Sequence, residues 1–389
     1  MKVSAIKTEK RIDVTDWKSY GIQTYGLYND YPQKLLEITA TSGTVSSCLK
    51  MYEKFVRGDG FNDEAFSKSV INKMTGLTAD RFLKFIVQDL ARFNGFAVHI
   101  NYNILGQKTD VSWIPFEFIR LGLPDDSGYI GKLLLHNDWG RRRTDRRWSK
   151  DDIKTVDIFN SNEDIAFSQI LEAGTIDKYS GQIYYFSGDG YMTYPKPIYD
   201  PVITDISSED GIATVRYRNI KYNFLPAGIL IRKTGMTEIA LNADGTAKDG
   251  ELDSFSEDFK KFQGADEACK IVDIEVSFDE EKPEFVPFEI QNLDKLHELS
   301  ETRSQNNIGG VFMQPPVLRG ELISGKLGTS SEITDAYNFY NSITTGERAD
   351  IDMVMQEIFT NYSYPVNTTN DFSIKKLQYL NDGNQNVNI

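Results

Sequence analysis

The sequence predicts an α+β fold, and three patterns support this class. Apolar residues recur at three- and four-residue steps between about residues 31 and 93, which is typical of amphipathic helices. Between about 95 and 188 they occur in short alternating runs, which is typical of strands. Few helical spacers separate these runs, so the sheet is expected to be mostly antiparallel.

The composition allows two domains, or one domain with large appendages. The chain has 389 residues, with 40% apolar and 26% charged residues, which is ordinary for a protein with a real core. Aromatic residues make up 12%. This high share suits either broad packed surfaces, including subunit contacts, or a Tyr-rich β core.

The charge and the cysteine count narrow the function classes. A net charge of −14 argues against a protein that binds DNA tightly. An acidic surface would still suit a protein along which DNA moves without adhering. The two cysteines, Cys48 and Cys269, form no metal motif and no disulfide framework. The N-terminus has no apolar signal segment and no stretch is long and apolar enough for a membrane span. We therefore expect a soluble, intracellular protein with no membrane partner.

Three helices are predicted in the N-terminal part. They cover residues 31–40, where Pro32 suits a first turn, then 44–57, ending at a Gly-Asp-Gly turn, and 79–93. Strands are predicted within the runs 95–103, 111–122, 131–139, 155–160 and 181–188. A further helix is predicted at 195–208.

The window from Asp249 to Glu301 is acid-rich and predicts a stalk. A charged helix up to Gly264 and a second helix at 289–307 flank two short strands, which are expected to form a hairpin around an acidic turn. Each helix has a narrow apolar stripe, which leaves most of its surface for solvent or another chain. Packing side by side in a ring would bury such a stalk. The residues concerned are Phe255, Phe259, Asp279, Glu280, Glu281, Leu293 and Leu296.

The segment after this stalk contains a near match to a phosphate-binding loop. Gly320, Gly325 and Lys326 have the required spacing, but Leu327 stands where a Ser or Thr would hold Mg²⁺. The preceding "QPPVLR" cannot be a central strand, because proline cannot donate to a sheet ladder. We therefore expect no nucleotide site. Pro315, Pro316 and Gly320 instead predict a rigid helix end followed by a loop.

A capping box at Thr329–Glu332 predicts the start of a long C-terminal helix. The helical pattern is interrupted near Gly346 and continues after it. The polar C-terminus is expected to be mobile.

One basic cluster interrupts the acidic sequence. It consists of Arg141, Arg142, Arg143, Arg146 and Arg147. The cluster suits contact with phosphate or an acidic partner. A solvated turn or an inter-subunit salt-bridge patch is the favoured interpretation, and the cluster is a candidate subunit-interface site.

No catalytic, cofactor or metal site is predicted, because no carboxylate pair, Ser-His-Asp set or metal-ligand spacing stands out. An enzyme remains the rival class: an acidic α+β hydrolase that acts on nucleotides or glycans with carboxylates of the 249–301 window.

The order of elements resembles the portal proteins of tailed bacteriophages from about Tyr28 to Phe359. "YNDYPQKLLEI" and "SGTVSSCLKMYEKFVRGDGF" are similar to the opening helices of that family, and "FLKFIVQDLARFNGFAVHI" to its helix and following strand. "SWIPFEFIRL" and "RNIKYNFLPAGIL" resemble later segments. The run "DSFSEDFKKFQG", "ACKIVDIEV", "EFVPFEI" and "GGVFMQPPVLRG" is the most characteristic. Gln314 departs from the family pattern, where a small or apolar residue is common.

The resemblance implies a portal-like architecture: an α/β wing, a helical stem, a small β clip and C-terminal helices of the wing and a small crown. The implied ranges are wing 1–245, stem helix 246–266, clip 267–289, second stem helix 290–310, Pro-Pro segment and tunnel loop 311–330, and C-terminal part 331–389. Arg319, Glu321 and Lys326 would be candidate DNA contacts in the tunnel loop.

The implied function is structural and not enzymatic. Twelve copies would form a ring at one capsid vertex, through which duplex DNA is packaged and ejected without sequence-specific contact. Implied partners are the terminase large subunit, the major capsid protein and a neck adaptor. The protein would be a virion component assembled in the bacterial cytoplasm. Another connector or baseplate ring protein is the alternative within the virion class.

Overall fold

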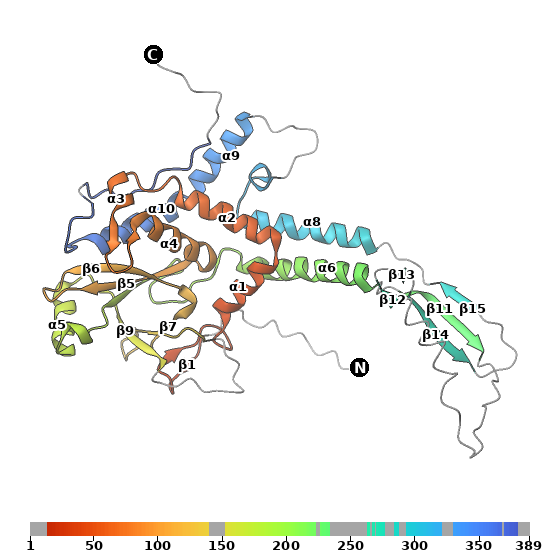
Figure 1. Ribbon diagram of the computed structural model, residues 1–389, viewed down its shortest axis with the longest axis horizontal. Helices are drawn as coiled ribbons and strands as arrows, with labels where there is room; N and C mark the ends of the chain where they lie inside the picture. Colours follow the sequence, from red (N-terminus) through yellow and green to blue (C-terminus); the bar gives the residue numbers. More distant parts are fainter. Residues whose placement is uncertain are drawn as a thin grey trace, which may run out of the picture. The chain divides into compact units, whose positions relative to one another are not determined.

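The computed structural model describes residues 14–139, 152–222, 226–233, 263–264, 267–268, 270–276, 284–287, 293–320, 330–367 and 369–379. The chain divides into two compact units. Unit 1 comprises the chain up to Ile206 and from Asn306 onward, and unit 2 comprises Ser207–Gln305. Figure 1 shows the elements of both.

Unit 1 contains a large mixed domain. Its helices are α1 (Tyr31–Thr41), α2 (Gly43–Arg57), α3 (Glu64–Lys68), α4 (Ala79–Phe93), α5 (Glu163–Ala173), α9 (Ser330–Ile343) and α10 (Thr345–Phe359), with 3₁₀ turns η1 (Phe116–Phe118), η3 (Ile176–Lys178), η4 (Asp200–Val202) and η5 (Pro316–Arg319). Its strands are β1 (Asp16–Trp17), β2 (Ile22–Gln23), β3 (Val70–Asn72), β4 (Leu77–Thr78), β5 (Gly95–Tyr102), β6 (Lys108–Ile114), β7 (Ile119–Leu121), β8 (Lys132–Leu135), β9 (Lys154–Ile158) and β10 (Gln182–Ser187). The helix α6 (Ile203–Tyr222) and the helix α8 (Leu293–Val311) have residues in both units.

The central sheet of unit 1 has six strands in the order β6-β5-β10-β9-β8-β7. Only β10 and β9 pair in parallel, and the other neighbours are antiparallel. The predicted α+β class and the mostly antiparallel sheet are therefore confirmed. The run 111–122 is broken after Ile114, because Pro115 and the turn η1 separate β6 from β7.

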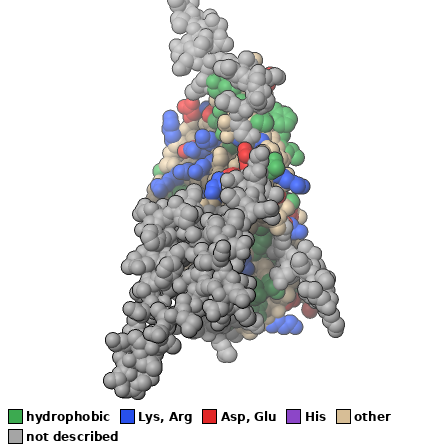
Figure 2. All heavy atoms as spheres, turned by 90° about the vertical axis from the view of Figure 1, so that its right-hand side faces the viewer, with side chains coloured by type: hydrophobic (Ala, Val, Ile, Leu, Met, Phe, Trp, Pro, Cys, Tyr) green, Lys and Arg blue, Asp and Glu red, His purple; other side chains and the backbone are tan. Residues whose placement is uncertain are grey.

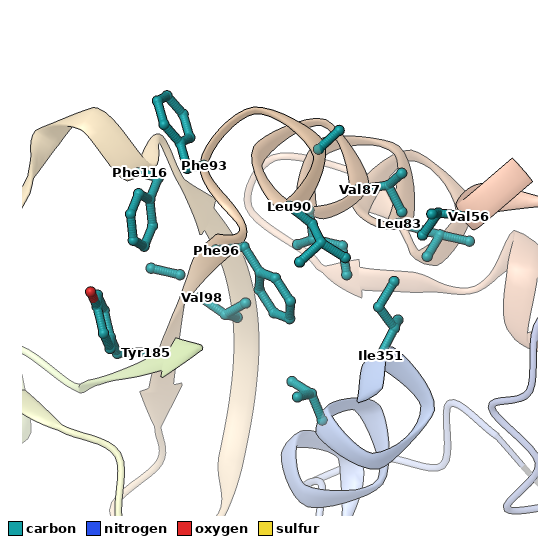
Figure 3. Close-up of a cluster of buried hydrophobic side chains, with 14 of the residues drawn as sticks. Val56, Leu83, Val87, Leu90, Phe93, Phe96, Val98, Phe116, Tyr185 and Ile351 are labelled. Atoms are coloured by element: carbon teal, nitrogen blue, oxygen red, sulfur yellow. The ribbon is translucent and has the colours of Figure 1, made fainter. Parts of the chain in front are cut away.

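The helix α4 contributes much of the core of this domain. Its buried side chains recur at three- and four-residue steps, including Phe82, Ile86 and Leu90, all at most 3% exposed. Figure 3 shows Leu90 of α4 beside Phe96 of β5, with Ile351 of α10 nearby. Helix α4 ends where Asn94 adopts a left-handed conformation, and β5 begins at the next residue. This order matches the helix and strand predicted from the sequence.

A buried carboxyl group joins α4 to the sheet. Asp89 is 2% exposed, and its Oδ2 accepts hydrogen bonds from Trp113 Nε1 (2.7 Å) and from the backbone N–H of Phe116 (3.2 Å). Burial raises the pKa of Asp89 to about 8, although both hydrogen bonds favour the ionised form. In the folded chain the group therefore holds its proton far above the pH at which an exposed carboxyl loses it.

We expect Asp89→Asn to flatten the dependence of stability on pH. Between about pH 4 and pH 8 the unfolded chain has lost this proton and the folded chain retains it, so the free energy of unfolding falls as pH rises. The variant lacks this titration. Urea unfolding of both proteins at pH 5 and pH 8 gives the check, since other groups cancel in the difference. The free energy of unfolding of the wild type minus that of the variant should be smaller at pH 8 than at pH 5. An equal difference at both pH values would contradict the raised pKa of Asp89.

Unit 2 contains a small sheet whose pairing differs from the prediction. That sheet consists of β11 (Pro226–Lys233), β14 (Lys270–Val276) and β15 (Glu284–Pro287), and a separate two-stranded sheet consists of β12 (Gln263–Gly264) and β13 (Glu267–Ala268). The expected hairpin of β14 with β15 is wrong: β11 lies between them, parallel to β14 and antiparallel to β15. The strand β11 comes from the apolar "PAGILI" run, far from its partners in sequence, so local patterns could not reveal the pairing.

Two helix predictions also need correction. The helix expected at 195–208 is α6, at Ile203–Tyr222, because Pro195, Pro197 and Pro201 keep the preceding residues out of an α-helix. The helix α5 was not predicted, although Asn162 caps it by accepting a hydrogen bond from the Asp164 N–H. Among the described helices, none is both long and apolar enough to cross a membrane.

Candidate functional site

The end of α8 is closed by a compact backbone motif. Met313 adopts a left-handed conformation with φ of 52° and donates its N–H to Gly310 O (3.0 Å). The N–H of Gln314 donates to Gly309 O (3.2 Å). This pair of bonds is the Schellman motif, which satisfies carbonyl groups at a helix C-terminus. The helix therefore ends before the double proline, and Pro315 follows as a residue that cannot continue it.

We expect Met313→Gly to stabilise the chain. The left-handed position normally holds glycine, because a Cβ atom costs about 1 kcal/mol there. The Met313 side chain is 62% exposed, so little packing is lost. An increase of about 0.5–1 kcal/mol in the free energy of unfolding should follow by urea titration. Met313→Ala, which keeps the backbone cost, is the matched control and should give no such increase.

Gln314 fastens the segment after α8 to two helices of unit 1. It is 5% exposed, and its Nε2 donates to Cys48 O in α2 (2.6 Å) and to the Tyr340 hydroxyl in α9 (3.2 Å). Tyr340 is fully buried, and burial raises its pKa. Gln314, a polar residue in an otherwise apolar run, therefore has a structural role: its amide donates to buried groups of α2 and α9.

The turn η5 continues the anchor as far as Gly320. It begins at Pro316, buries Leu318, and ends where Gly320 has φ of 79°. The guanidinium group of Arg319 packs on α8, since a Cβ atom at Gly309 would lie 1.7 Å from Arg319 Nη1. A larger residue at 309 would therefore displace the Arg319 side chain. Arg319, predicted as a DNA contact, is half-buried at this position.

The described residues on either side of 321–329 are fixed within unit 1. Gln314 and η5 lie on the N-terminal side, and α9, where Ala336 and Tyr340 are buried, lies on the C-terminal side. Phe312 adds a second fixed point, with its ring stacked on Tyr199 at 6.1 Å between centroids.

The helices α6 and α8 contact each other in both units. In unit 1, Asn307 donates from Nδ2 to Asp205 Oδ2 (3.2 Å). In unit 2, Arg216 and Glu301 form a charge-assisted hydrogen bond. Because that ion pair is partly exposed, it adds little to stability and serves mainly to align α6 with α8. The described helix that pairs with α8 is therefore α6, while the helix predicted at 249–262 falls outside the described residues.

Most predicted site residues fall in segments that the structure does not describe. These are Arg141, Arg142, Arg143, Arg146, Arg147, Phe255, Phe259, Asp279, Glu280, Glu281, Glu321 and Lys326, together with the near phosphate loop after Gly320. Leu293 and Leu296 lie in α8. Of the predicted set, the structure brings together Pro315, Pro316, Arg319 and Gly320. Gln314, Gly309 and Tyr340, which complete this anchor, were not predicted.

Comparison with known proteins reveals the fold. No family model and no curated protein sequence matches the chain. Among solved structures, a chain in the neck of a native gene transfer agent particle, computed with C12 symmetry, matches with a TM-score of 0.52. It has 11% identity, over 86% of this chain and 82% of that chain.

Two further structures are similar. A chain in the virion of the native gene transfer agent matches with a TM-score of 0.50 and 11% identity, over 84% of this chain and 81% of that chain. An HK97 family phage portal protein from Corynebacterium diphtheriae matches with a TM-score of 0.46 and 10% identity, over 82% of this chain and 88% of that chain. The chain is thus an α+β protein with a fold found in virions. More particularly, it shares that fold, across most of its length, with a component of a particle neck.

Proposed function

We propose that this protein is a portal: copies of it form a ring at one capsid vertex, through which duplex DNA is packaged and ejected. The observation that carries this proposal is the shared fold with a chain of a particle neck computed with C12 symmetry, over 86% of this chain. A closed cyclic ring places one copy of the same loop at each step around an axis. Twelve copies are the proposed number.

The two units support an assignment of parts. We assign unit 1 to the wing and its C-terminal helices, and unit 2 to the stem and clip. This moves the boundary of the wing from residue 245 to Ile206, because β11 pairs with β14 and β15 of unit 2. The helices α6 and α8 form the stem pair. The tunnel loop would lie within 311–330, after the double proline, with Arg319, Glu321 and Lys326 as its candidate DNA contacts.

The partners follow from this role. The terminase large subunit and a neck adaptor would bind the clip in turn, and the major capsid protein would surround the wing. The basic cluster Arg141 to Arg147 is proposed to lie at a subunit interface. The protein itself would carry out no catalysis, and it would be assembled in the bacterial cytoplasm and retained in the virion.

The oligomeric mass tests the proposal. Native mass spectrometry of the purified chain should show a species of twelve 44.2 kDa subunits, about 530 kDa. Co-expression with the capsid protein provides a second condition, because ring closure can require a partner surface. Monomers or dimers alone under both conditions, across salt and protein concentration, would overturn the proposed ring.

A further inference from the structure

The chain is acidic, with a net charge of −14, yet it has a basic surface on two packed helices. Figure 2 shows Lys and Arg side chains gathered at mid-height on the face that it draws. A basic surface that can be defined residue by residue lies over α2 and α4. It is named here the α2–α4 basic face, and it comprises Lys50, Lys54, Arg57, Arg81, Lys84 and Arg92.

Helical spacing places these side chains on one surface. Lys50, Lys54 and Arg57 follow one another at four- and three-residue steps on α2, so they share a face. Arg81, Lys84 and Arg92 share a face of α4 opposite its buried side chains. Successive lysines four residues apart are separated by about 6 Å along the helix axis.

Contacts between the helices show that the two faces adjoin. Arg57 Nη2 lies 2.9 Å from Asp80 Oδ2, which joins the end of α2 to the start of α4. Glu53, between Lys50 and Lys54 in sequence, interacts electrostatically with Arg92 and Lys84 of α4. Burial nevertheless raises the pKa of Glu53. The two helices therefore run antiparallel, with cations on both.

The cations of this face outnumber its two carboxylates, Glu53 and Asp80, among the described residues. Lys50, Lys54 and Lys84 are exposed, and among the described residues none of them lies within 4.0 Å of a carboxylate. Only Arg57 has such a partner, Asp80. The face therefore has a net positive charge, and such a surface on an acidic protein favours an external anion.

The chemistry of the face distinguishes between possible anions. No large apolar side chain of α2 or α4 is among the exposed ones of the described chain. Protein interfaces are centred on aromatic and apolar anchors and are depleted in lysine, so this face is poorly suited to a protein partner. A duplex, which carries about one phosphate charge per 1.7 Å of axis, needs only cations.

We propose that the α2–α4 basic face binds the phosphate backbone of duplex DNA without regard to sequence. This surface is distinct from the tunnel loop. It extends the proposed function, but the binding does not require a ring. Each lysine that meets a phosphate releases counterions, so the affinity should fall steeply with salt.

The test uses the full chain and a covalently closed circular duplex, which cannot thread a closed ring. The variant is the triple change Lys50→Gln, Lys54→Gln and Lys84→Gln. The matched control is Lys18→Gln, Lys178→Gln and Lys196→Gln, three exposed lysines of unit 1 outside both helices. Glu53→Gln removes the acidic group within the face. Thermal unfolding confirms that each variant folds.

The expected results are specific. In gel-shift titrations at 50 mM salt, the triple variant should bind at least about tenfold more weakly than the wild type, and the slope of log K against log salt should fall by about 2.7. The control should bind within about twofold of the wild type, and Glu53→Gln should bind more tightly.

Four outcomes would overturn the proposal. These are no binding by the wild type, equal losses in the triple variant and its control, no loss in the triple variant, or a changed oligomeric mass with DNA binding intact. The last would indicate that the face contacts another copy. A failure to form rings alone would contradict the proposed function and not this inference.

Discussion

Replacing Arg120 with methionine is expected to destabilise the chain by about 3–5 kcal/mol. Arg120 is fully buried and donates from Nε to Asn29 Oδ1 (2.6 Å) and from Nη2 to Asn29 O (2.7 Å). From Nη1 it also donates to the carbonyl groups of Glu117 (3.0 Å) and Ile119 (2.7 Å). Methionine fills part of the volume but leaves these oxygens buried without a donor.

The guanidinium also shapes the chain before α1. Asn29 has φ of 60°, and its Oδ1 accepts a second bond, from the Tyr25 N–H (2.9 Å). Burial lowers the pKa of Arg120 to about 10, so the group stays charged at neutral pH and its donors are fully available. The Arg120 side chain of β7 therefore joins the sheet to the turn that leads into α1.

Urea unfolding of Arg120→Met against the wild type measures this effect. Arg303→Met, at an exposed position, is the matched control and should lie within about 0.5 kcal/mol of the wild type. Arg120→Lys keeps the charge but not the forked donor geometry, so it should recover only part of the loss. A cost below about 1 kcal/mol for Arg120→Met would show that the network contributes little.

Replacing Gly58 with alanine is expected to cost about 3–4 kcal/mol. Gly58 ends α2 with φ of 55° and ψ of −147°, a conformation that side chains avoid. A Cβ atom there would lie 1.8 Å from the carbonyl oxygen of Lys375. That oxygen accepts the Asp59 N–H (3.1 Å), so the blocked backbone cannot move away without losing this bond.

The change should also release the C-terminal segment that this turn holds. Phe61 and Ile374 form an antiparallel bridge and are both buried, so proteolysis near residue 375 should become faster. Gly76→Ala is the control, because Gly76 has φ of 68° but nothing within 4 Å of a Cβ atom. It should cost about 1 kcal/mol. If both variants lost the same free energy of unfolding, the predicted clash between a Cβ atom at position 58 and the Lys375 carbonyl would be contradicted.

Local patterns predicted those parts of the fold that local chemistry determines. The helix α4 and the strand β5 were predicted because core periodicity and the turn between them are both visible in sequence. The extent of α6 was not, since the helix is largely polar and contains Gly211. The central place of β11 depends on partners about 40 to 60 residues away, which short-range patterns cannot specify.

The candidate site was predictable to a similar degree. The double proline and Gly320 indicated where α8 ends and a loop begins. The anchoring role of Gln314 was not visible, because its partners, Cys48 O and the Tyr340 hydroxyl, come from distant helices. A polar residue within an otherwise apolar "VFMQPPV" run was the available signal, since a buried amide needs hydrogen-bond partners. Arg120, likewise, resembles an ordinary strand residue until its neighbours are known.

Electron microscopy of the purified protein tests the central claim most directly. End-on class averages should show closed rings with a central channel about 20 Å wide or more, enough for a B-form duplex, whose grooves alone are about 8 Å deep. Twelvefold averages would support the proposed number of copies. Particles without a channel, or a closed assembly whose opening is too narrow for a duplex, would contradict the account.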